Sequence, residues 1–548
     1  MVFSALVLGS LFLGFSYKLH IVHGVEVVKP HPSDTNWNGN SEHHDQLYIT
    51  NKIVAPDGFH RSTVLAGRTL HGASFPGPLI AGRKGDRFVI NVTDVLTDPA
   101  MIRSTTIHWH GLFQKTTNYE DGVAFISQCP IAANHSFLYD FGVPDQAGTF
   151  WYHSHLSVQY GDGLRGPLVI YDPEDPHQDL YDVDDESTVV TIADWFHLTS
   201  LQLLAALVVP SADTTLINGK GRYAGGPDTP LAVIQVEHGK RYRFRIIEMS
   251  FDAFHGFSID NHNFTIIEVD GINTEPHTVN FIELYPAQRY SVILHANQVV
   301  SNYRIRALSS TGVGAHNFTN GVNSAILRYV GAPEEDPTTS QPPASEVKML
   351  REGDLHPLEN SGAPGKPYPS GADVILNFTL GFDPDTVRFS INGVVFEPPT
   401  VPVLLQILSG AQHAQDLLPT GGVYTLPPNK VIEINFYGGE APSGPHPFHL
   451  HGHAFDVIRT SDSPEYNFEN PVRRDTTSVA MNNQTTIRFV TDNAGPWFLH
   501  CHIDLHLDLG LAVVLAEDTR DTKQDDPVPV DWEALCPIYN SLTPSQLP

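Results

Sequence analysis

Apolar and polar residues alternate along much of the chain. In residues 241–246 three apolar side chains alternate with three arginines, and residues 432–436 follow the same pattern with Glu433 and Asn435. A period of two places one face of a strand on a core and the other face in solvent. No long stretch keeps the 3.6-residue period of an amphipathic helix, and the 43 glycines and 42 prolines suit short strands joined by turns. The pattern predicts an all-β fold of sandwich architecture.

Three apolar runs, at 166–172, 324–330 and 510–516, have the composition of closing strands of successive units. A turn rich in Asp and Pro follows the first run, and a linker rich in proline and acids, at 332–343, follows the second. We therefore predict three β domains, at 45–174, 175–345 and 346–548. A chain of 548 residues is long enough for three such domains.

The N-terminal region indicates export. An apolar run at 2–15 has the length of a signal-peptide core, which predicts a signal peptide at 1–24 and a secreted, extracellular protein. Six sequons predict glycosylation, at Asn91, Asn134, Asn263, Asn317, Asn377 and Asn483. No later segment approaches the ~20 uninterrupted apolar residues of a membrane span.

The net charge of -29 excludes nucleic acid as a partner, because phosphate would be repelled. It fits a soluble protein that works alone, and we expect a monomer.

Four His-x-His pairs stand in strand-like runs toward opposite ends of the chain: His108 and His110, His153 and His155, His449 and His451, His500 and His502. Residues i and i+2 of a strand share a face, so each pair offers two imidazoles side by side. Imidazole suits copper and zinc. Eight rings can converge only if the first and last domains pack together. The alternatives are a zinc site or ordinary buried and surface histidines.

Cys501 narrows the choice of metal. Its neighbours His500 and His502 face one way along the strand, so the thiol faces the other. A thiolate with two imidazoles makes a trigonal blue-copper site, for which His446 and His506 are candidates. Leu511 stands where a weak axial sulfur ligand would usually lie. Leucine cannot coordinate, which predicts a three-coordinate ion of raised potential.

Four motifs carry a family resemblance: HWHG at 108–111, GTFWYHSH at 148–155, HPFHLHGH at 446–453 and HCHIDLH at 500–506. They resemble the copper signatures of multicopper oxidases, and the sequence from about residue 45 to the C-terminus is most similar to fungal laccases. The resemblance implies three cupredoxin-like Greek-key β-sandwich domains, packed around a copper cluster between domains one and three.

The resemblance also implies four copper ions and their ligands. A type 1 copper would be held by His446, Cys501 and His506, and a type 2 copper by His108 and His449. The type 3 pair would be held by His110, His153 and His502 on one ion, and by His155, His451 and His500 on the other. His453 matches no ligand position and has a structural role in this interpretation.

Three acids match functional positions of the family. Asp121 and Asp504 match proton donors for O2 reduction, although both could equally serve only to orient histidines. Asp252 matches the acid at the exposed edge of the type 1 copper. A carboxylate there can accept the proton of a phenol as the electron leaves toward His506.

The resemblance is incomplete at the disulfides. Cys129 and Cys536 match one family pair, whereas Gly161 and Phe251 stand at the positions of the other. This departure removes a crosslink beside Asp252. Residues 208–210, which we expect to line the substrate pocket, are also particular to this chain.

The implied function is that of a laccase, a benzenediol:oxygen oxidoreductase. It takes single electrons from phenols and aromatic amines and uses four of them to reduce O2 to water. The alternatives are another multicopper oxidase, such as a ferroxidase or a pigment-pathway phenol oxidase, and a copper carrier without turnover. A ferroxidase would need acids clustered beside His446 and His506. The residues do not separate lignin degradation from pigment formation or detoxification.

Overall fold

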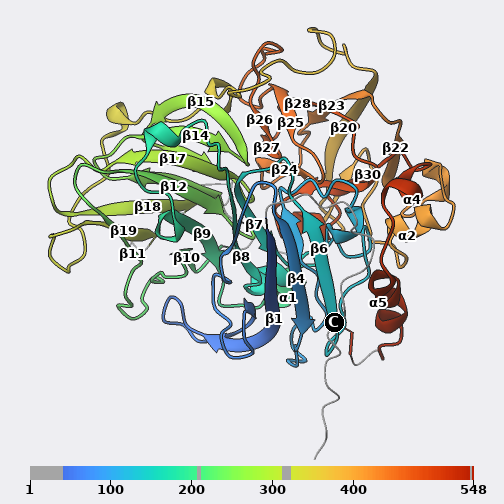
Figure 1. The fold of residues 1–548 in the computed structure, drawn as a ribbon, viewed down its shortest axis with the longest axis horizontal. Coiled ribbons are helices and arrows are strands. Elements are labelled where there is room, and N and C mark those ends of the chain that lie inside the picture. Colours follow the sequence, from blue (N-terminus) through green and yellow to red (C-terminus); the bar gives the residue numbers. More distant parts are fainter. Residues whose placement is uncertain (1–40, 207–210, 253, 311–322, 544–545, 548) are drawn as a thin grey trace, which may run out of the picture. The chain divides into compact units, whose positions relative to one another are not determined.

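A computed structural model of the chain describes residues 41–206, 211–252, 254–310, 323–543 and 546–547. Its strands form six sheets, two from each third of the chain. The predicted all-β class with three sandwich domains is thereby confirmed. Figure 1 shows the three groups of strands by colour. We call them the first, middle and last domains, and the boundaries at 174 and 345 stay predictions.

The first domain contains two four-stranded sheets, β2-β1-β4-β6 and β3-β8-β7-β5. Its strands are β1 (Glu42–Val54), β2 (Arg61–Gly67), β3 (Ile80–Arg83), β4 (Arg87–Asp94), β5 (His108–His110), β6 (Ser136–Gly142), β7 (Gly148–His153) and β8 (Arg165–Tyr171).

The middle domain pairs sheet β10-β9-β12-β17-β14-β15 with sheet β11-β19-β18-β13-β16. Its elements are β9 (Val189–Trp195), α1 (Ser200–Ala206), β10 (Thr214–Ile217), β11 (Val233–Val236), β12 (Arg241–Glu248), β13 (Phe254–Ile259), β14 (Phe264–Val269), β15 (Ile272–Val279), β16 (Ile282–Leu284), β17 (Arg289–His295), β18 (Asn302–Ser310) and β19 (Ser324–Tyr329).

The last domain pairs sheet β21-β20-β23-β28-β25-β26 with sheet β22-β30-β29-β24-β27. Its strands are β20 (Val374–Asp383), β21 (Arg388–Ile391), β22 (Val423–Leu426), β23 (Val431–Tyr437), β24 (His446–Leu450), β25 (Phe455–Arg459), β26 (Arg473–Arg474), β27 (Thr476–Val479), β28 (Gln484–Val490), β29 (Gly495–Cys501) and β30 (Ala512–Glu517). Its helices are α2 (Val403–Leu408), α3 (Asp504–Asp508), α4 (Thr522–Asp525) and α5 (Val530–Asn540).

Short 3-10 helices lie between these elements: η1 (Asn118–Glu120), η2 (Gln159–Asp162), η3 (Gln178–Leu180), η4 (Glu186–Thr188), η5 (Ala344–Glu346), η6 (Glu352–Asp354) and η7 (Ala414–Asp416).

The closing strand of each domain pairs in the same way. The three apolar runs singled out in the sequence form β8, β19 and β30. Each of them pairs in parallel with a short earlier strand, which is β3, β11 or β22, and antiparallel with the strand just before it. Parallel neighbouring strands need a crossover connection between them. In each domain the closing strand therefore pairs with a strand that lies well before it in the sequence.

One expectation about the strands is wrong. The polar faces of β12 and β23 do not lie in solvent, since Arg245 and Glu433 are each only 1% exposed. Arg245 pairs with Asp184 at 2.7 Å, and Glu433 accepts from Arg488 at 2.8 Å. Other parts of the chain cover these faces and supply charges of opposite sign, which a buried charge requires. Alternation therefore located the strands but not their exposure.

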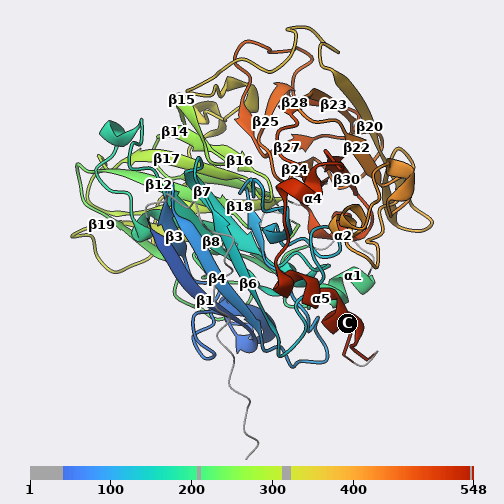
Figure 2. The ribbon, with the colours of Figure 1, turned by 45° about the vertical axis from the view of Figure 1, so that its right-hand side comes forward.

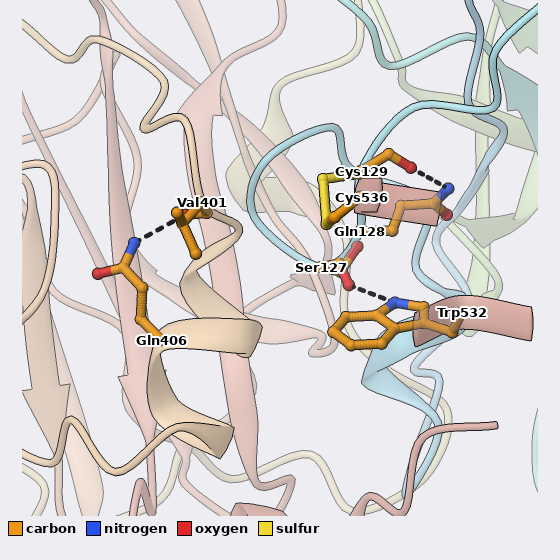
Figure 3. The surroundings of a disulfide bond; sticks show 7 residues. All are labelled: Ser127, Gln128, Cys129, Val401, Gln406, Trp532 and Cys536. Atoms are coloured by element: carbon orange, nitrogen blue, oxygen red, sulfur yellow. Dashed lines mark hydrogen bonds between the residues drawn. A yellow bond between two sulfur atoms is a disulfide. The ribbon is translucent and has the colours of Figure 1, made fainter. Parts of the chain in front are cut away.

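Helix α5, from the C-terminal part of the chain, packs on the first domain. Both views show α5 beside β6 of the first domain (Figures 1 and 2). Trp532 and Leu535 of α5 belong to the apolar core of the first domain, and the Trp532 indole donates to the Ser127 carbonyl at 2.9 Å. The disulfide that the resemblance implies, Cys129–Cys536, joins the two segments (Figure 3).

The predicted signal peptide lies outside the described residues, as do Asn317 and residues 208–210. Among the described residues, no helix combines the length and apolarity that crossing a membrane needs.

Candidate metal centres

The four histidine pairs lie at strand ends of the first and last domains. In the first domain β5 and β7 are neighbours, with His108 opposite His153. In the last domain β24 and β29 are neighbours, with His449 opposite His500. Directly opposed side chains of an antiparallel pair lie within contact distance. Each sheet therefore presents its two pairs as one group.

The two groups meet at the seam between the domains. The ring centroids of His110 and His449 lie 3.8 Å apart, and those of His108 and His451 lie 4.1 Å apart. His155 of the first domain lies 5.2 Å from His500 of the last. All eight rings are between 0% and 7% exposed. The structure thus brings the four sequence-predicted pairs into one buried cluster.

Oxygen atoms of the chain fix the orientation of five of these rings through Nδ1. These contacts are His108 to the Asp121 carbonyl at 2.7 Å, His153 to that of Ser154 at 2.8 Å, His500 to that of Cys501 at 2.9 Å, His449 to that of Asp475 at 3.0 Å, and His451 to Oδ2 of Asp121 at 2.9 Å. A ring that donates through Nδ1 keeps a lone pair on Nε2. This is the usual second contact of a histidine that binds a metal.

The Nε2 atoms of these rings have the surroundings expected of metal-binding atoms. Those of His108, His153 and His449 are buried and have no hydrogen-bond partner among the described residues. Nε2 of His451 lies 3.1 Å from Nε2 of His500. Both rings already donate through Nδ1, so two lone pairs face each other, an arrangement that a cation between them would stabilise. The donor set fits copper ions.

The donor atoms group as follows. Those of His155, His451 and His500 lie within 4.8 Å of one another, which is one predicted type 3 set. The centroids of the other set, His110, His153 and His502, lie 4.9 to 5.8 Å apart. Donor atoms within 4.8 Å of one another also form two other sets, which are His108, His449 and His451, and His108, His110 and His153. The assignment of rings to individual ions stays a prediction.

Burial favours the uncharged form of five of these rings. Desolvation first, and then neighbouring histidines, lower the pKa of His110, His153, His155, His451 and His502 well below the ordinary value. Neutral imidazole is the form that binds metal.

The candidate mononuclear site lies on the other face of β29. Sγ of Cys501 is 3.7 Å from Nδ1 of both His446 and His506, and the two Nδ1 atoms are 3.2 Å apart. Strand β24 supplies His446, and α3, which follows β29, turns the chain back to supply His506. The thiol points away from the histidine cluster, as the alternation along β29 predicts.

Desolvation shifts the pKa of all three side chains of the candidate mononuclear site. Burial lowers the pKa of His446 to about 4 and that of His506 well below its ordinary value. Burial raises the pKa of the Cys501 thiol, so its thiolate requires a neighbouring cation.

Apolar groups complete the mononuclear site. Leu511 is fully buried, its carbonyl accepts from the Cys501 amide at 3.1 Å, and its own amide donates to the His506 carbonyl at 3.0 Å. The Phe389 ring of β21 lies 4.5 Å from that of His506. Sequence reasoning missed Phe389, because nothing near residue 389 marks it as close to the site.

The two acids that the resemblance treats alike have different surroundings. Oδ2 of Asp121 accepts from His451 at 2.9 Å, and Oδ1 lies 3.2 Å from Nδ1 of His108. Asp504 is buried, and its Oδ2 has no hydrogen-bond partner among the described residues. Desolvation, and then the charge of Asp508, raise the pKa of Asp504 well above its ordinary value. The contacts of Asp121 agree with the orienting alternative, whereas burial favours the protonated form of Asp504.

Asp252 lies in a buried loop that is held from two sides. Its backbone amide donates to Asp194 at 2.7 Å, and the preceding Phe251 carbonyl accepts from the Asp504 amide at 3.0 Å. Desolvation, and then the charge of Asp194, raise the pKa of Asp252 to about 8. A Cβ at Gly161 would lie 2.7 Å from the Phe251 ring, so an aromatic ring fills the space at the missing disulfide.

His453 faces away from the cluster. Its Nδ1 lies 3.3 Å from the His451 carbonyl, and its Nε2 lies 3.1 Å from Glu517. These contacts agree with a structural role.

Sequence reasoning also missed Asp475 and Arg289. Asp475 is 2% exposed, and its Oδ1 lies 3.5 Å from Nδ1 of His449 and 3.6 Å from Nε2 of His110. Two arginines immediately precede Asp475 in the sequence. This run of three charged residues in a buried stretch is a sequence signal that could have drawn attention to Asp475. Arg289, which pairs with Asp475 at 2.7 Å, begins an ordinary strand and carries no such signal.

Comparison with known proteins agrees with this geometry. Three family models described as multicopper oxidase match residues 50–175, 186–332 and 396–521. The chain is 58% identical to a laccase of Phlebia radiata over 502 residues, which cover 91% of this chain and 94% of that protein. It is 56% identical to Laccase-2 of Pleurotus ostreatus over 505 residues, which cover 91% and 92%.

Solved structures show the same fold. The laccase from Botrytis aclada matches with a TM-score of 0.79 at 30% identity, covering 94% of this chain and 95% of that chain. Fet3p, described as a multicopper oxidase that functions in iron import, matches with a TM-score of 0.77 at 28% identity, covering 91% and 95%. The chain belongs to the multicopper oxidase family, and it binds copper as that family does. Within the family its activity is that of a laccase, which is how relatives at more than half identity are named.

Proposed function

We propose that the chain oxidises phenols and aromatic amines one electron at a time, with four copper ions held at the two centres. His446, Cys501 and His506 would hold the type 1 ion, and the eight paired histidines would hold the type 2 ion and the type 3 pair. The observation that carries this proposal is the convergence of unpartnered, buried donor atoms, above all the facing Nε2 atoms of His451 and His500 at 3.1 Å.

Bound copper would supply the one-electron acceptor at the mononuclear site and the electrons that reduce O2 to water at the other. The chain connects the two centres covalently, because Cys501 stands between His500 and His502. His506 retains 6% exposure while His446 and Cys501 have none, so the substrate approaches from the side of His506.

The acids divide the proton chemistry between them. Asp252 accepts the proton that a phenol loses on oxidation, which requires the ionised carboxylate. Asp504 keeps a proton on a buried carboxyl and can release it toward the histidine cluster when O2 is reduced. Asp121 accepts from His451 through its carboxylate and from His108 through its main-chain carbonyl, and its role is to orient these rings.

A copper count with an absorption spectrum tests the proposal on purified protein. We expect four copper ions per chain, an intense thiolate absorption and a band of the coupled pair. O2 consumption should follow addition of a simple phenol. Fewer ions without thiolate absorption would contradict the ligand set. Faster turnover of Fe2+ than of the phenol would favour the ferroxidase alternative.

The chain would act as an exported, glycosylated monomer. Asn134, Asn263, Asn377 and Asn483 are exposed and accessible to glycosylation. Asn91 is half-buried on β4, and its amide donates to Gln46 at 2.8 Å. Enzymatic deglycosylation of the secreted protein should lower its mass, and an unchanged mass would contradict glycosylation.

A further inference from the structure

An arginine of the middle domain reaches the trinuclear centre, although that domain supplies none of the proposed ligands. Arg289, at the start of β17, is fully buried. Its two terminal nitrogens donate to the two carboxylate oxygens of Asp475 at 2.8 and 2.7 Å. This bidentate pairing fixes the direction of the carboxylate as well as its distance.

Asp475, in turn, contacts two of the proposed ligand rings. Its carbonyl accepts from Nδ1 of His449 at 3.0 Å, and its Oδ1 lies 3.6 Å from Nε2 of His110. The Thr476 hydroxyl donates to the same Oδ1 at 2.8 Å. The two rings come from different domains, so Asp475 contacts ligands on both sides of the seam, His449 through its main-chain carbonyl and His110 through its carboxylate.

The guanidinium itself has little freedom to move. Its Nε donates to the Thr149 carbonyl of the first domain at 3.0 Å, and Nη1 donates to the Ala287 carbonyl at 3.1 Å. The Arg289 backbone amide donates to Asp270 at 2.8 Å. Arg289 therefore makes hydrogen bonds with residues of all three domains.

The glycine of the HWHG motif provides space for this contact. Gly111 has φ +91°, and a Cβ there would lie 2.4 Å from Nη2 of Arg289 and 2.9 Å from Oδ2 of Asp475. Any side chain at position 111 would displace the pair. The residue after His110 is thus matched to an arginine of another domain, far along the chain.

We propose that Arg289 is a positioning residue of the trinuclear centre, which orients His449 and His110 through Asp475. The proposal rests on the ligand set proposed above. A lysine at this position would keep the charge but lose the planar pair of donors, so it separates orientation from charge.

The test compares Arg289→Lys with Arg245→Lys in the full chain. Arg245 is a matched control because it is 1% exposed, pairs bidentately with Asp184 at 2.7 Å and also reaches Thr149. Cu2+ is titrated into copper-free protein while the type 2 electron paramagnetic resonance and the thiolate absorption are recorded. We expect R289K to bind the type 2 ion about 10- to 100-fold more weakly with unchanged thiolate absorption. R245K should titrate as the original protein does.

A second variant, Asp475→Asn, tests the same contact if R289K does not fold. It keeps the carbonyl that faces His449 and weakens the arginine pair. It should reproduce the loss of type 2 affinity, and the R289K/D475N double variant should lose little more than either single variant. Type 2 affinity and resonance unchanged in the folded variants would overturn the proposal. Absence of copper binding in the original protein would instead overturn the ligand set itself.

Discussion

The mononuclear and trinuclear centres are built in contrasting ways. The first takes all three donors from the last domain, through two neighbouring strands and the helix that follows, and apolar Phe389 and Leu511 surround it. The second spans the seam of two domains, and chain oxygens hold most of its rings by Nδ1. A site inside one sheet needs only correct strand register. A site at a seam also needs groups that hold the two sides in register with each other.

The buried acids also differ from one another. Desolvation raises the pKa of Asp252 and Asp504 and favours their protonated forms. At Asp475 burial acts in the same direction, but the charge and hydrogen bonds of Arg289 and the contact with His449 together outweigh it and lower the pKa below the ordinary range. These shifts suit Asp252 and Asp504 to the proton exchange proposed for them, and Asp475 to the orienting contact proposed above.

Among the tests of this contrast between the two centres, Cys501→Ser should have the largest effect. An alcohol does not replace the thiolate at a blue-copper site, so the thiolate absorption and phenol turnover should fall to background. Copper at the histidine cluster should remain, because its ligands lie on the opposite face of β29. Absorption spectroscopy and copper analysis test this, and retained colour would refute the assignment of Cys501.

Asp252→Asn should affect phenols selectively. Loss of the proton acceptor is expected to lower phenol turnover about 100-fold, at the low end for general acid–base groups, with little change for a non-protic electron donor. Because the pKa of Asp252 is raised to about 8, its ionised fraction increases as pH rises toward that value. The ratio of phenol to non-protic rates should therefore increase with pH in the original protein and stay flat in D252N. Equal losses on both donors would remove the proton role.

Asp121→Ala removes the carboxylate that holds His451 across the seam, and leaves the main-chain carbonyl that accepts from His108. We expect an affinity for the trinuclear copper ions that is weaker by about tenfold, the lower end for such supporting groups. The thiolate absorption should not change. Cu2+ titration of copper-free protein measures the effect, and Asp504→Ala is the control, since Oδ2 of Asp504 has no partner among the described residues. Comparable losses in both variants would contradict the distinction drawn between the two acids.

Leu511→Met should produce the smallest effect, confined to the mononuclear site. A thioether in the axial position favours the oxidised ion, and we expect a potential lower by roughly 60 mV, which is a tenfold change in a one-electron equilibrium. A redox titration followed by the thiolate absorption measures it. If the potential does not move, Leu511 is not the axial residue.

Local patterns predicted more of the molecule than long-range ones. The i, i+2 spacing of the histidines and the opposite direction of Cys501 are properties of a single strand, so the sequence alone could place them. Asp475 and Arg289 become part of the site only when three domains meet, and no local pattern announces that. The buried Arg243 and Arg245 show the same limit, because an arginine on a strand indicates solvent until a neighbouring segment supplies its acid.

The helix α5 has a consequence for how the molecule is made. Trp532 and Leu535 complete the apolar core of the first domain, so that domain is unfinished while the ribosome is still making the others. We therefore expect the first domain, and its half of the copper cluster, to reach their final packing only after α5 has been synthesised.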